Sequence, residues 1–600
     1  MVSGRLVLRA ALIGALTGGV VGVCELLIIA VRRFGLGHIL YLGPQALWMT
    51  PAVDLVLFGV IGLLSAIAAL VLRPERRTLV VSIVLLAVAF LALLLHVVWL
   101  DERAALIVAL GVAIQAGRPM SRGWDRISRF AAVSVATLAT VVVLLALGLG
   151  PALRWQEARR IARLPSAPEG APNILLLVLD TVRALNLGVY GYNRPTSPGI
   201  DSVARQGVVF ERAYATASYT LPSHGSFFTG RDAHELNADI TVPLDTTFPT
   251  LAGRLGAAGY ATGAFVANQR YVTPEWGLAR GFARFEVYPV TLQELPLNAS
   301  LTRRLLTSGK FRRLIGYHDI VNRKRAGRVH DELLAWLNRR QDRPFFAFLN
   351  YFDAHEPYLP PAPFATMFGA TPPAPAPRSD YQARAVVLTG RIMRALNAEE
   401  KRRHQDAYDG AIRYLDHEIQ DLLGNLTRRG LLENTIVVIT SDHGEHQGDG
   451  DRYLHSFDLF GPVLHVPLIV VYPKAVPAGV RFADPVSLAD LPATLGHLAG
   501  IDERLGLPGR SLINREGASG QPQQGRTVMA SFRTGCKGEP RFSVIQGRHQ
   551  YLRDGACGEY LYDLVADPLA LNNLLGAAPA DSVAAALRAL GTARLEQATH

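Results

Sequence analysis

Apolar residues are concentrated near the start of the chain, in long uninterrupted segments. Four of these segments, at 10–31, 53–72, 78–100 and 130–153, have the length of about 20 residues that a helix needs to cross a bilayer. A fifth stretch, 104–117, is shorter, and taken alone its length also fits an interfacial or re-entrant segment. The pattern predicts an all-α transmembrane bundle over residues 1–153.

The number of crossings decides on which side of the membrane the rest of the chain lies. If all five segments cross and the N-terminus is inside, the inside stretches hold most of the nearby arginines: Arg5, Arg9, Arg73, Arg76, Arg77, Arg118, Arg122, Arg126 and Arg129. The outside loops hold fewer: Arg32, Arg33 and Arg103. This asymmetry follows the positive-inside rule. It predicts a multi-pass protein of the cell (inner) membrane with an extracytoplasmic remainder, whereas four crossings would leave that remainder in the cytoplasm.

One carboxylate, Glu25, interrupts the first apolar segment. A charged group is costly inside a bilayer, so its side chain is expected to face other helices or a polar cavity. Two interpretations stay open, namely contact with a lipid or substrate, and a neutral residue hydrogen-bonded between helices.

From residue 173 the pattern changes to short apolar runs that alternate with longer amphipathic ones. The runs are NILLLVLD, ATGAFVAN, PFFAFLNYF, NTIVVITSD and PLIVVYP. This alternation predicts an α/β catalytic domain over 173–515, with a doubly wound parallel sheet and helices on both faces. The basic amphipathic start and the Pro-, Ser- and Gly-rich end of 154–172 indicate a linker that begins on the membrane surface. Short strands and a final helix predict a small C-terminal α+β subdomain over 516–600.

Composition and charge narrow the classes of partner. Half of the residues are hydrophobic and the net charge is +11, with a mean hydropathy of +0.20. No basic run interleaves with aromatic residues as single-strand binders require, so no nucleic-acid partner is expected. The basic clusters lie beside apolar segments, where membrane lipid is the expected partner. Cys536 and Cys557 flank a predicted strand–turn–strand. They could form a disulfide if this domain is extracytoplasmic, or they could be two free thiols.

Polar residues at the carboxyl ends of the strands are the candidates for chemistry, because that is where ligands bind doubly wound sheets. Two apolar runs end in Asp180–Thr181 and Asp442–His443, and TLPSHG presents the Thr220 hydroxyl at a predicted helix start. Carboxylates and an imidazole suit one divalent cation, which would lower the pKa of that hydroxyl. The N–H groups of the helix N-terminus would favour an anion.

Each candidate taken alone also has a plain structural explanation. An aspartate after an apolar strand is often the N-cap of the next helix, and T-x-P-S-H can be a capped turn. His355, in FDAHEPY, can be a surface-loop residue. The joint placement of these residues on one sheet favours a functional site.

The chain resembles the sulfatase family of the alkaline phosphatase superfamily from Asn173 to about Asn573. The resemblance is carried, in the family's order, by PNILLLVLDTVRA, GVYGYNRPTSPGID, TLPSHGSFFTG, FLNYFDAHEPY, TIVVITSDHGE, LHVPLIV and YLYDLVADPLALNNL. It implies the sulfatase-like fold with its small C-terminal subdomain, and an ester-cleaving enzyme that uses a metal ion.

The resemblance also implies a metal centre and a nucleophile. Asp180, Asp442 and His443 match the family's ligands for one divalent metal ion, which would be Ca, Mg, Mn or Zn. Thr220 stands at the position of the nucleophile and would contact the same ion. Thr181 falls where many members have a second liganding aspartate, so it is a further metal candidate.

Three histidines complete the implied catalytic set. His355 and His455 match positions that contact the anionic substrate or protonate the leaving group. His224 replaces an arginine, so a bidentate fork is lost and a titratable donor is gained. Asn268 falls near a substrate-contacting lysine of the family.

Thr220 itself departs from the family's pattern. Sulfatases typically carry C-x-P-S-R or S-x-P-S-R, and the first residue is oxidised to formylglycine. The β-carbon of threonine carries a methyl group, so it cannot give that aldehyde. A sulfated threonine would depend on slow attack by water at sulfur, whereas a phosphorylated one can be attacked again in line. Similar threonines occur in lipoteichoic acid synthases and lipid A phosphoethanolamine transferases, which also place this domain outside, behind five transmembrane helices.

The sequence therefore predicts a metal-dependent sulfatase-family hydrolase or transferase. Its substrate would be an anionic ester of an extracytoplasmic glycan, lipid or small molecule, of phosphate type in preference to sulfate. The alternative is a catalytically inactive membrane scaffold that binds an anionic glycan or lipid. Leu185, where relatives commonly have aspartate, keeps that alternative open.

Overall fold

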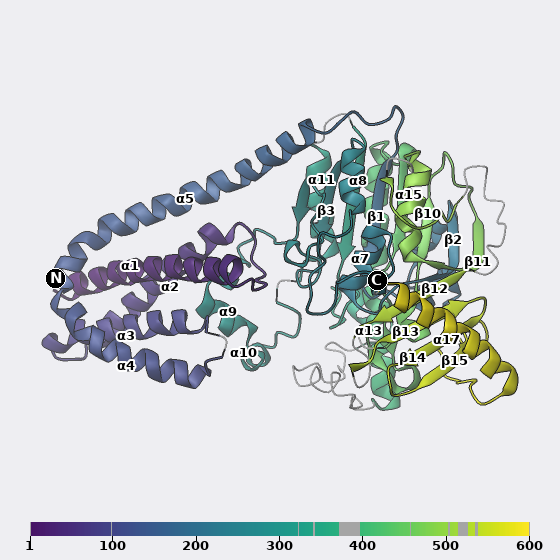
Figure 1. Ribbon diagram of the computed structural model, residues 1–600. Coiled ribbons are helices and arrows are strands. Elements are labelled where there is room, and N and C mark those ends of the chain that lie inside the picture. The colour runs from purple at the N-terminus through teal and green to yellow at the C-terminus, as the bar shows by residue number, and fades with distance from the viewer. Residues whose placement is uncertain are drawn as a thin grey trace. The chain divides into compact units, whose positions relative to one another are not determined.

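The chain folds into two compact units in the computed structural model, which describes residues 2–97, 99–321, 323–339, 343–370, 396–455, 458–501, 505–513, 526–533 and 538–598. The helical unit comprises Met1–Arg159 and Tyr288–Asn322, and the α/β unit comprises Arg160–Val287 and Arg323–His600 (Figure 1). The first boundary lies within the linker expected at 154–172. Residues 288–322, which the sequence pattern had included in the catalytic domain, fold with the helical unit.

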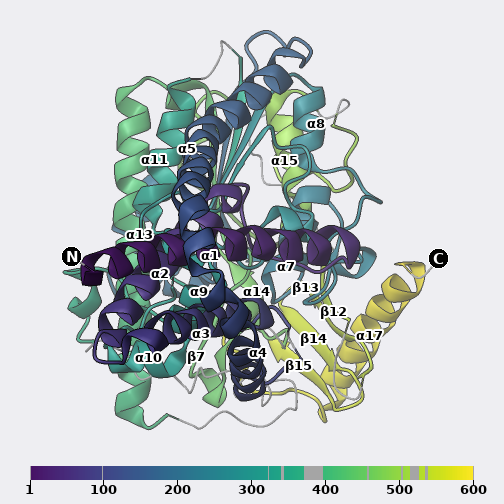
Figure 2. The same cartoon turned by 90° about the vertical axis from the view of Figure 1, so that its left-hand side faces the viewer.

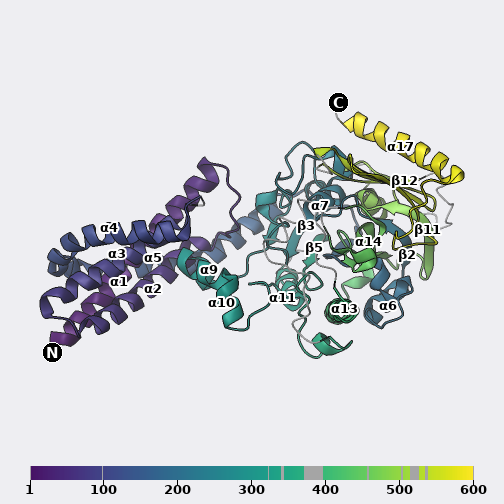
Figure 3. The same ribbon diagram turned by 90° about the horizontal axis from the view of Figure 1, so that it is seen from below.

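The helical unit contains five helices that are long and apolar enough to cross a membrane. They are α1 (Val2–Ala30), α2 (Ala46–Ala69), α3 (Pro74–Leu94), α4 (Glu102–Arg122) and α5 (Trp124–Ala162). The short apolar stretch at 104–117 is the centre of α4, which is 21 residues long. Helices α1 to α4 lie side by side (Figure 3). The structure therefore supports five candidate spans in place of four.

Small residues bring α1 and α2 close together. Gly14, Gly18 and Gly22 recur every fourth residue along α1 and face α2. A Cβ atom at Gly18 would lie 2.1 Å from the main-chain oxygen of Asp54, a distance that no side chain tolerates. Helices in lipid associate through such close packing, because lipid tails are as apolar as leucine.

The Gly18→Val variant is expected to lower the melting temperature of the detergent-solubilised chain by several degrees. The added atoms must push α1 away from α2, and overpacking of this kind typically costs about 1–3 kcal/mol. Gly111→Val is the matched control, because a Cβ atom at Gly111 of α4 meets nothing within 4 Å. Scanning fluorimetry of both variants checks the prediction, and equal melting temperatures would contradict it.

A nine-stranded sheet forms the centre of the α/β unit, in the order β11-β2-β10-β6-β1-β5-β3-β4, with β9 beside β2. The strands are β1 (Asn173–Leu179), β2 (Val208–Tyr214), β3 (Ala261–Val266), β4 (Arg284–Glu286), β5 (Phe345–Tyr351), β6 (Thr435–Thr440), β9 (His465–Val466), β10 (Leu468–Val471) and β11 (Val480–Ser487). The expected runs at β1, β3, β5 and β6 pair in parallel. The expected run at β10 is antiparallel to both neighbours.

The orientation of β10 follows from its connection to β6. A parallel return needs a crossover of a dozen or more residues, usually a helix. The chain between β6 and β10 contains only short elements: β7 (His446–Gln447), β8 (Tyr453–Leu454), α14 (Gly461–Leu464) and β9. No helical crossover is formed in the described part of this connection. The sheet is therefore mixed, and not wholly parallel as expected.

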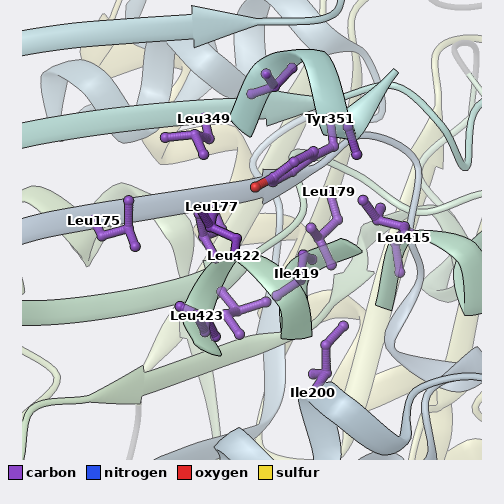
Figure 4. Close-up of a cluster of buried hydrophobic side chains, with 14 of the residues drawn as sticks. Leu175, Leu177, Leu179, Ile200, Leu349, Tyr351, Leu415, Ile419, Leu422 and Leu423 are labelled. Atoms are coloured by element: carbon purple, nitrogen blue, oxygen red, sulfur yellow. The ribbon is translucent and has the colours of Figure 1, made fainter. Parts of the chain in front are cut away.

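Helices cover both faces of the sheet, as expected for a doubly wound fold. Figure 2 shows α11 (Ala326–Leu337) and α13 (Ala398–Arg428) on one side, and α8 (Leu251–Ala257) and α15 (Leu491–Ala499) on the other. Figure 4 shows leucines of β1, among them Leu177, against Leu422 and neighbouring residues of α13. Burying each such side chain contributes about 1.5–3 kcal/mol. Since β1 is covered on both faces, its sequence is continuously apolar and not alternating.

A four-stranded antiparallel sheet follows near the C-terminus. Its strands, in spatial and chain order, are β12 (Thr527–Phe532), β13 (Arg541–Gln546), β14 (His549–Asp554) and β15 (Glu559–Asp563). The last helix, α17 (Ala578–Ala598), packs Ala584 and Leu587 against this sheet. Cys557 is disulfide-bonded, and Cys536 lies outside the described residues.

Candidate active site

The two predicted aspartates meet at one edge of the sheet. Asp180 follows β1 and Asp442 follows β6, and these strands are parallel neighbours, so their carboxyl ends lie together. Ligand atoms of Asp180, Asp442 and His443 all lie within 4.8 Å of one another. All three side chains are fully buried. Residues that are far apart in the sequence therefore form one compact triad.

The triad fits a divalent cation. Asp180 Oδ1 and Asp442 Oδ2 are buried and accept no hydrogen bond from any described residue. Burial raises the pKa of Asp180 well above its usual value, and the neighbouring Asp442 raises it further. Burial also raises the pKa of Asp442, to about 7. Two buried carboxyl groups in this arrangement need a positive charge to be ionised together.

The imidazole of His443 is in the neutral form that a metal ligand requires. Burial lowers its pKa to about 4, so the imidazole is uncharged at neutral pH. Its Nδ1 is 3.0 Å from the main-chain oxygen of Gly444 and donates to it, so the lone pair is on Nε2. That nitrogen lies 3.4 Å from Asp442 Oδ2. Neutral imidazole is the form that binds metal ions.

Thr220 begins α7 (Thr220–Thr229) beside this triad. Its hydroxyl oxygen lies 3.4 Å from His443 Nε2, and the residue is 2% exposed. The Ser223 hydroxyl donates to the main-chain oxygen of Asp442 at 2.5 Å, which fixes α7 to the loop after β6. The N-terminus of a helix favours anions, so a negatively charged group is stabilised next to this hydroxyl.

His355 and His455 lie next to the triad. The ring of His455 is 4.4 Å from that of His443 and 5.1 Å from that of His355, between centroids. His355 Nδ1 bonds the main-chain oxygen of Glu356 at 2.9 Å, and His455 Nδ1 bonds Glu445 Oε1 at 2.8 Å. In both rings Nδ1 is held by this hydrogen bond, which fixes the orientation of the ring.

Two other predicted residues lie beside Asp442: the Thr181 N–H donates to its Oδ1 at 3.3 Å, and His224 Nδ1 is 3.6 Å from its Oδ2. The Thr181 hydroxyl donates to the main-chain oxygen of Asp180 at 2.7 Å, and its backbone has a φ of 66°. His224 Nδ1 bonds the main-chain oxygen of Thr220 at 2.8 Å, and its ring packs against Phe227. Burial lowers the pKa of His224 to about 3, so this ring is neutral. Thr181 as a ligand and His224 as a catalytic group stay predictions.

Asn268 and Arg323 hold parts of the site in position. Asn268 Nδ2 donates to Asp180 Oδ2 at 2.8 Å, which orients that carboxylate. Arg323 donates from one nitrogen to the main-chain oxygens of Phe352 and His355, at 2.6 and 3.2 Å. It therefore fixes the loop that carries His355. No sequence pattern pointed to Arg323, because these hydrogen bonds go to backbone atoms.

A buried acid behind His455 was also not assigned a role from the sequence. Glu445 accepts from His455 through Oε1 and from the Tyr358 hydroxyl through Oε2, the latter at 2.8 Å. Burial raises the pKa of Glu445 to about 7. The pair resembles the carboxylate–histidine arrangement in which the carboxylate sets the tautomer of the ring. In the sequence, only the strings SDHGE, which contains Glu445, and HEPY, which contains Tyr358, could have indicated this contact.

The geometry can support one kind of chemistry in particular. A triad that fits a cation, a hydroxyl at a helix N-terminus and two further imidazoles lie close together. Such a set can activate the hydroxyl as a nucleophile, hold an anionic group and supply a proton to a leaving group.

Comparisons with known proteins agree on the fold and the kind of enzyme. A family model described as Sulfatase matches residues 172–501. A choline-sulfatase of Rhizobium meliloti (strain 1021) is 24% identical over 430 residues, which cover 68% of this chain and 82% of that protein.

Solved structures of similar fold include two phosphonate monoester hydrolases. That of Agrobacterium radiobacter is 22% identical, with a TM-score of 0.54, and the match covers 71% of this chain and 95% of the other. That of Silicibacter pomeroyi is 19% identical, with a TM-score of 0.53 and coverage of 71% and 95%. At these identities the likeness shows the fold alone.

Proposed function

This chain belongs to the sulfatase family and is an ester hydrolase, and from that premise we propose that it cleaves or transfers phosphate-type esters with Thr220 as nucleophile. One observation carries the proposal. Thr220 Oγ1 lies 3.4 Å from Nε2 of His443, whose ligand atoms cluster with those of Asp180 and Asp442.

The chain's residues divide the work of the reaction as follows. Asp180, Asp442 and His443 would hold a divalent cation. When bound, that ion supplies positive charge that lowers the pKa of a nearby hydroxyl and offsets charge on the ester. Thr220 loses its proton to solvent and attacks the phosphorus, so an O–P bond to threonine forms and the bond to the leaving oxygen breaks.

Proton transfer to the leaving oxygen completes this step. His455 is the proposed donor, because Glu445 fixes its Nδ1 and its ring lies 4.4 Å from that of His443. His355, whose ring lies 5.1 Å away, is proposed to contact the anion. Water or an alcohol then gives its proton to His455 and attacks the phosphorus of the phosphothreonine. The O–P bond to Thr220 breaks, and the threonine oxygen takes up a proton from solvent. Water gives hydrolysis and an alcohol gives transfer.

Threonine at this position favours phosphorus over sulfur. A formylglycine hydrate releases sulfate by eliminating it and reforming an aldehyde, and threonine lacks that route because its β-carbon carries a methyl group. Phosphorus in a phosphothreonine can be attacked again in line. The similarity to enzymes named phosphonate monoester hydrolase and choline-sulfatase supports both classes of anionic ester as substrates to test.

The five candidate spans support a membrane-anchored enzyme. The arginine distribution supports an extracytoplasmic site, and lipid or glycan esters are the substrates that such a site would reach.

The full chain in detergent is expected to hydrolyse an aryl phosphodiester at least about tenfold faster than the matching aryl sulfate, a difference in barrier of about 1.4 kcal/mol. The assay compares p-nitrophenyl phosphodiester, phosphonate monoester, phosphate monoester and sulfate with Ca²⁺, Mg²⁺, Mn²⁺ or Zn²⁺ added in turn. Faster turnover of the sulfate would contradict the phosphorus preference. No turnover of any of the four esters would contradict the proposed chemistry.

A further inference from the structure

Residues 288–322 interrupt the sequence of the α/β unit but belong to the helical unit. They contain α9 (Ser300–Thr307) and α10 (Gly309–Leu314). Glu25, the carboxylate inside α1, receives the start of α9. Its Oε2 accepts from the main-chain nitrogen of Ser300 at 3.1 Å, and its Oε1 accepts from the Ser300 hydroxyl. The buried Glu25 side chain thus anchors this segment.

Further hydrogen bonds seat the segment at one end of the bundle. The Thr50 hydroxyl of α2 donates to the main-chain oxygen of Asn298 at 2.9 Å, and the Ser300 hydroxyl lies 3.0 Å from the main-chain oxygen of Ala92 in α3. Thr50 is near the first residue of α2, and Ala92 is near the last of α3. The contacts therefore all lie at the same end of the helices.

Glu25 lies close to the end of α1, so α9 begins near one end of the bundle. Glu25 precedes Ala30, the last residue of α1, by about 7 Å along the helix axis, at a rise of about 1.5 Å per residue. The helix α9 therefore starts below the ends of the helices that hold it. Trp99 and Phe34, at the same end, are 86% and 83% exposed. Exposed aromatic residues at helix ends are typical of the membrane interface.

The outer part of the segment combines exposed apolar and basic side chains. Leu305, Leu314 and Ile315 are 51%, 83% and 55% exposed. Lys310 and Arg313 are exposed beside them and have no carboxylate within ion-pair distance among the described residues. Unpaired cations next to exposed leucines are what an element in the plane of the headgroups presents.

We propose that the α9–α10 segment, residues 300–315, binds the anionic phospholipid surface around the helical bundle. Leu314 and Ile315 enter the boundary between headgroups and acyl chains, and Lys310 and Arg313 pair with lipid phosphates. Charge complementarity favours an anionic lipid surface over a neutral one, because each basic side chain near such a surface adds attraction. The inference is independent of the chemistry of the active site.

The test measures whether position 314 meets lipid in the full chain. The variant Leu314→Cys, in a Cys24→Ala background, is labelled with an environment-sensitive nitrobenzoxadiazole dye and placed in nanodiscs. The lipids are phosphatidylcholine alone or an equimolar mixture with phosphatidylglycerol, each with a doxyl-labelled quencher lipid. Quenching is expected to be at least about threefold stronger with phosphatidylglycerol.

Charge reversal separates lipid binding from a nonspecific effect. Lys310→Glu combined with Arg313→Glu is expected to reduce the quenching to the level seen in phosphatidylcholine. The control, Arg205→Glu with Lys474→Glu, makes the same change in net charge at exposed residues of the α/β unit and is expected to leave the quenching unchanged. No quenching in either lipid overturns the proposal. Equal quenching in both lipids, insensitive to the reversal at 310 and 313, overturns the anionic preference and with it the proposal.

Discussion

The variant Thr220→Ala is expected to lower turnover of the best phosphoester substrate at least about a thousandfold, because removing a covalent nucleophile abolishes the first step. Its melting temperature is expected to change little. The Thr220 hydroxyl lies 3.4 Å from His443 Nε2, and it forms no hydrogen bond to a main-chain group in the described part of the chain. Steady-state hydrolysis of an aryl phosphodiester by the detergent-solubilised chain measures the effect.

Two variants serve as controls for this loss. Thr220→Ser keeps a hydroxyl at the same position and is expected to retain activity within about tenfold of the original. Thr229→Ala makes the same change at the other end of α7, where the hydroxyl donates to the main-chain oxygen of Gly225 at 2.8 Å. It is expected to cost stability and leave turnover nearly unchanged. Undiminished hydrolysis by Thr220→Ala would exclude Thr220 as the nucleophile.

The centre of the site was predictable because each of its members ends a strongly apolar strand. β1 and β6 are continuous apolar runs, so the residues after them, Asp180 and Asp442, had to lie at one edge of a sheet. The family resemblance then supplied the pairing of these strands with Thr220. Here the apolar pattern of each strand and the rule for parallel sheets lead to the same prediction, so the sequence indicates which side chains lie together.

Other features depend on contacts that no local pattern records. The direction of β10 depends on how the chain returns from β6, and its apolar run is the same for either direction. Arg323 acts on backbone oxygens, which are common to all sequences. The partner of Glu25 is Ser300, which lies far along the chain and outside every apolar segment. Its burial could be predicted from the cost of a charge in lipid, but its partner could not.

The residues that the sequence predicted and those that it did not predict act together in this site. The predicted aspartates provide charge, while unpredicted residues such as Asn268 and Glu445 orient the groups around them. The charged residues of such a site can therefore be predicted from a sequence, because they follow directly after apolar strands. Its precision comes from long-range contacts that only the folded chain contains.

The variant Asp442→Asn is expected to remove both the contribution of Asp442 to the pH dependence of metal-free stability and the stabilisation by divalent cations. Its amide oxygen can still accept from the main-chain N–H groups of Thr181 and His443, which bond Asp442 Oδ1 at 3.3 and 3.0 Å. The side chain has the same shape but cannot ionise. The fold is therefore retained while the charge is lost.

The sign of the pH dependence follows from the raised pKa. Burial raises the pKa of Asp442 from 3.8 to about 7 in the folded chain. Below pH ~4 the carboxyl group is protonated in both the folded and the unfolded chain, so its burial costs nothing there. Between pH ~4 and pH ~7 only the unfolded chain ionises, and the free energy of unfolding falls by up to about 4 kcal/mol. Asp442 thus destabilises the metal-free chain most at and above neutral pH.

Melting temperatures of the metal-free chain and of Asp442→Asn, measured in detergent from pH 4.5 to pH ~7.5, check this prediction. The melting temperature of the original chain minus that of Asp442→Asn is expected to fall by several degrees over that range. It is expected to recover when a divalent cation is added, since a ligand at about 100 times its Kd stabilises by about 2.7 kcal/mol. Asp442→Asn itself is expected to gain no stability from the cation. Asp449→Asn is the opposing control: burial acts to raise the pKa of Asp449, but Arg183 outweighs it and lowers the pKa, so this variant is expected to be destabilised at neutral pH. A cation that stabilises Asp442→Asn as much as the original chain would show that the triad is not its binding site.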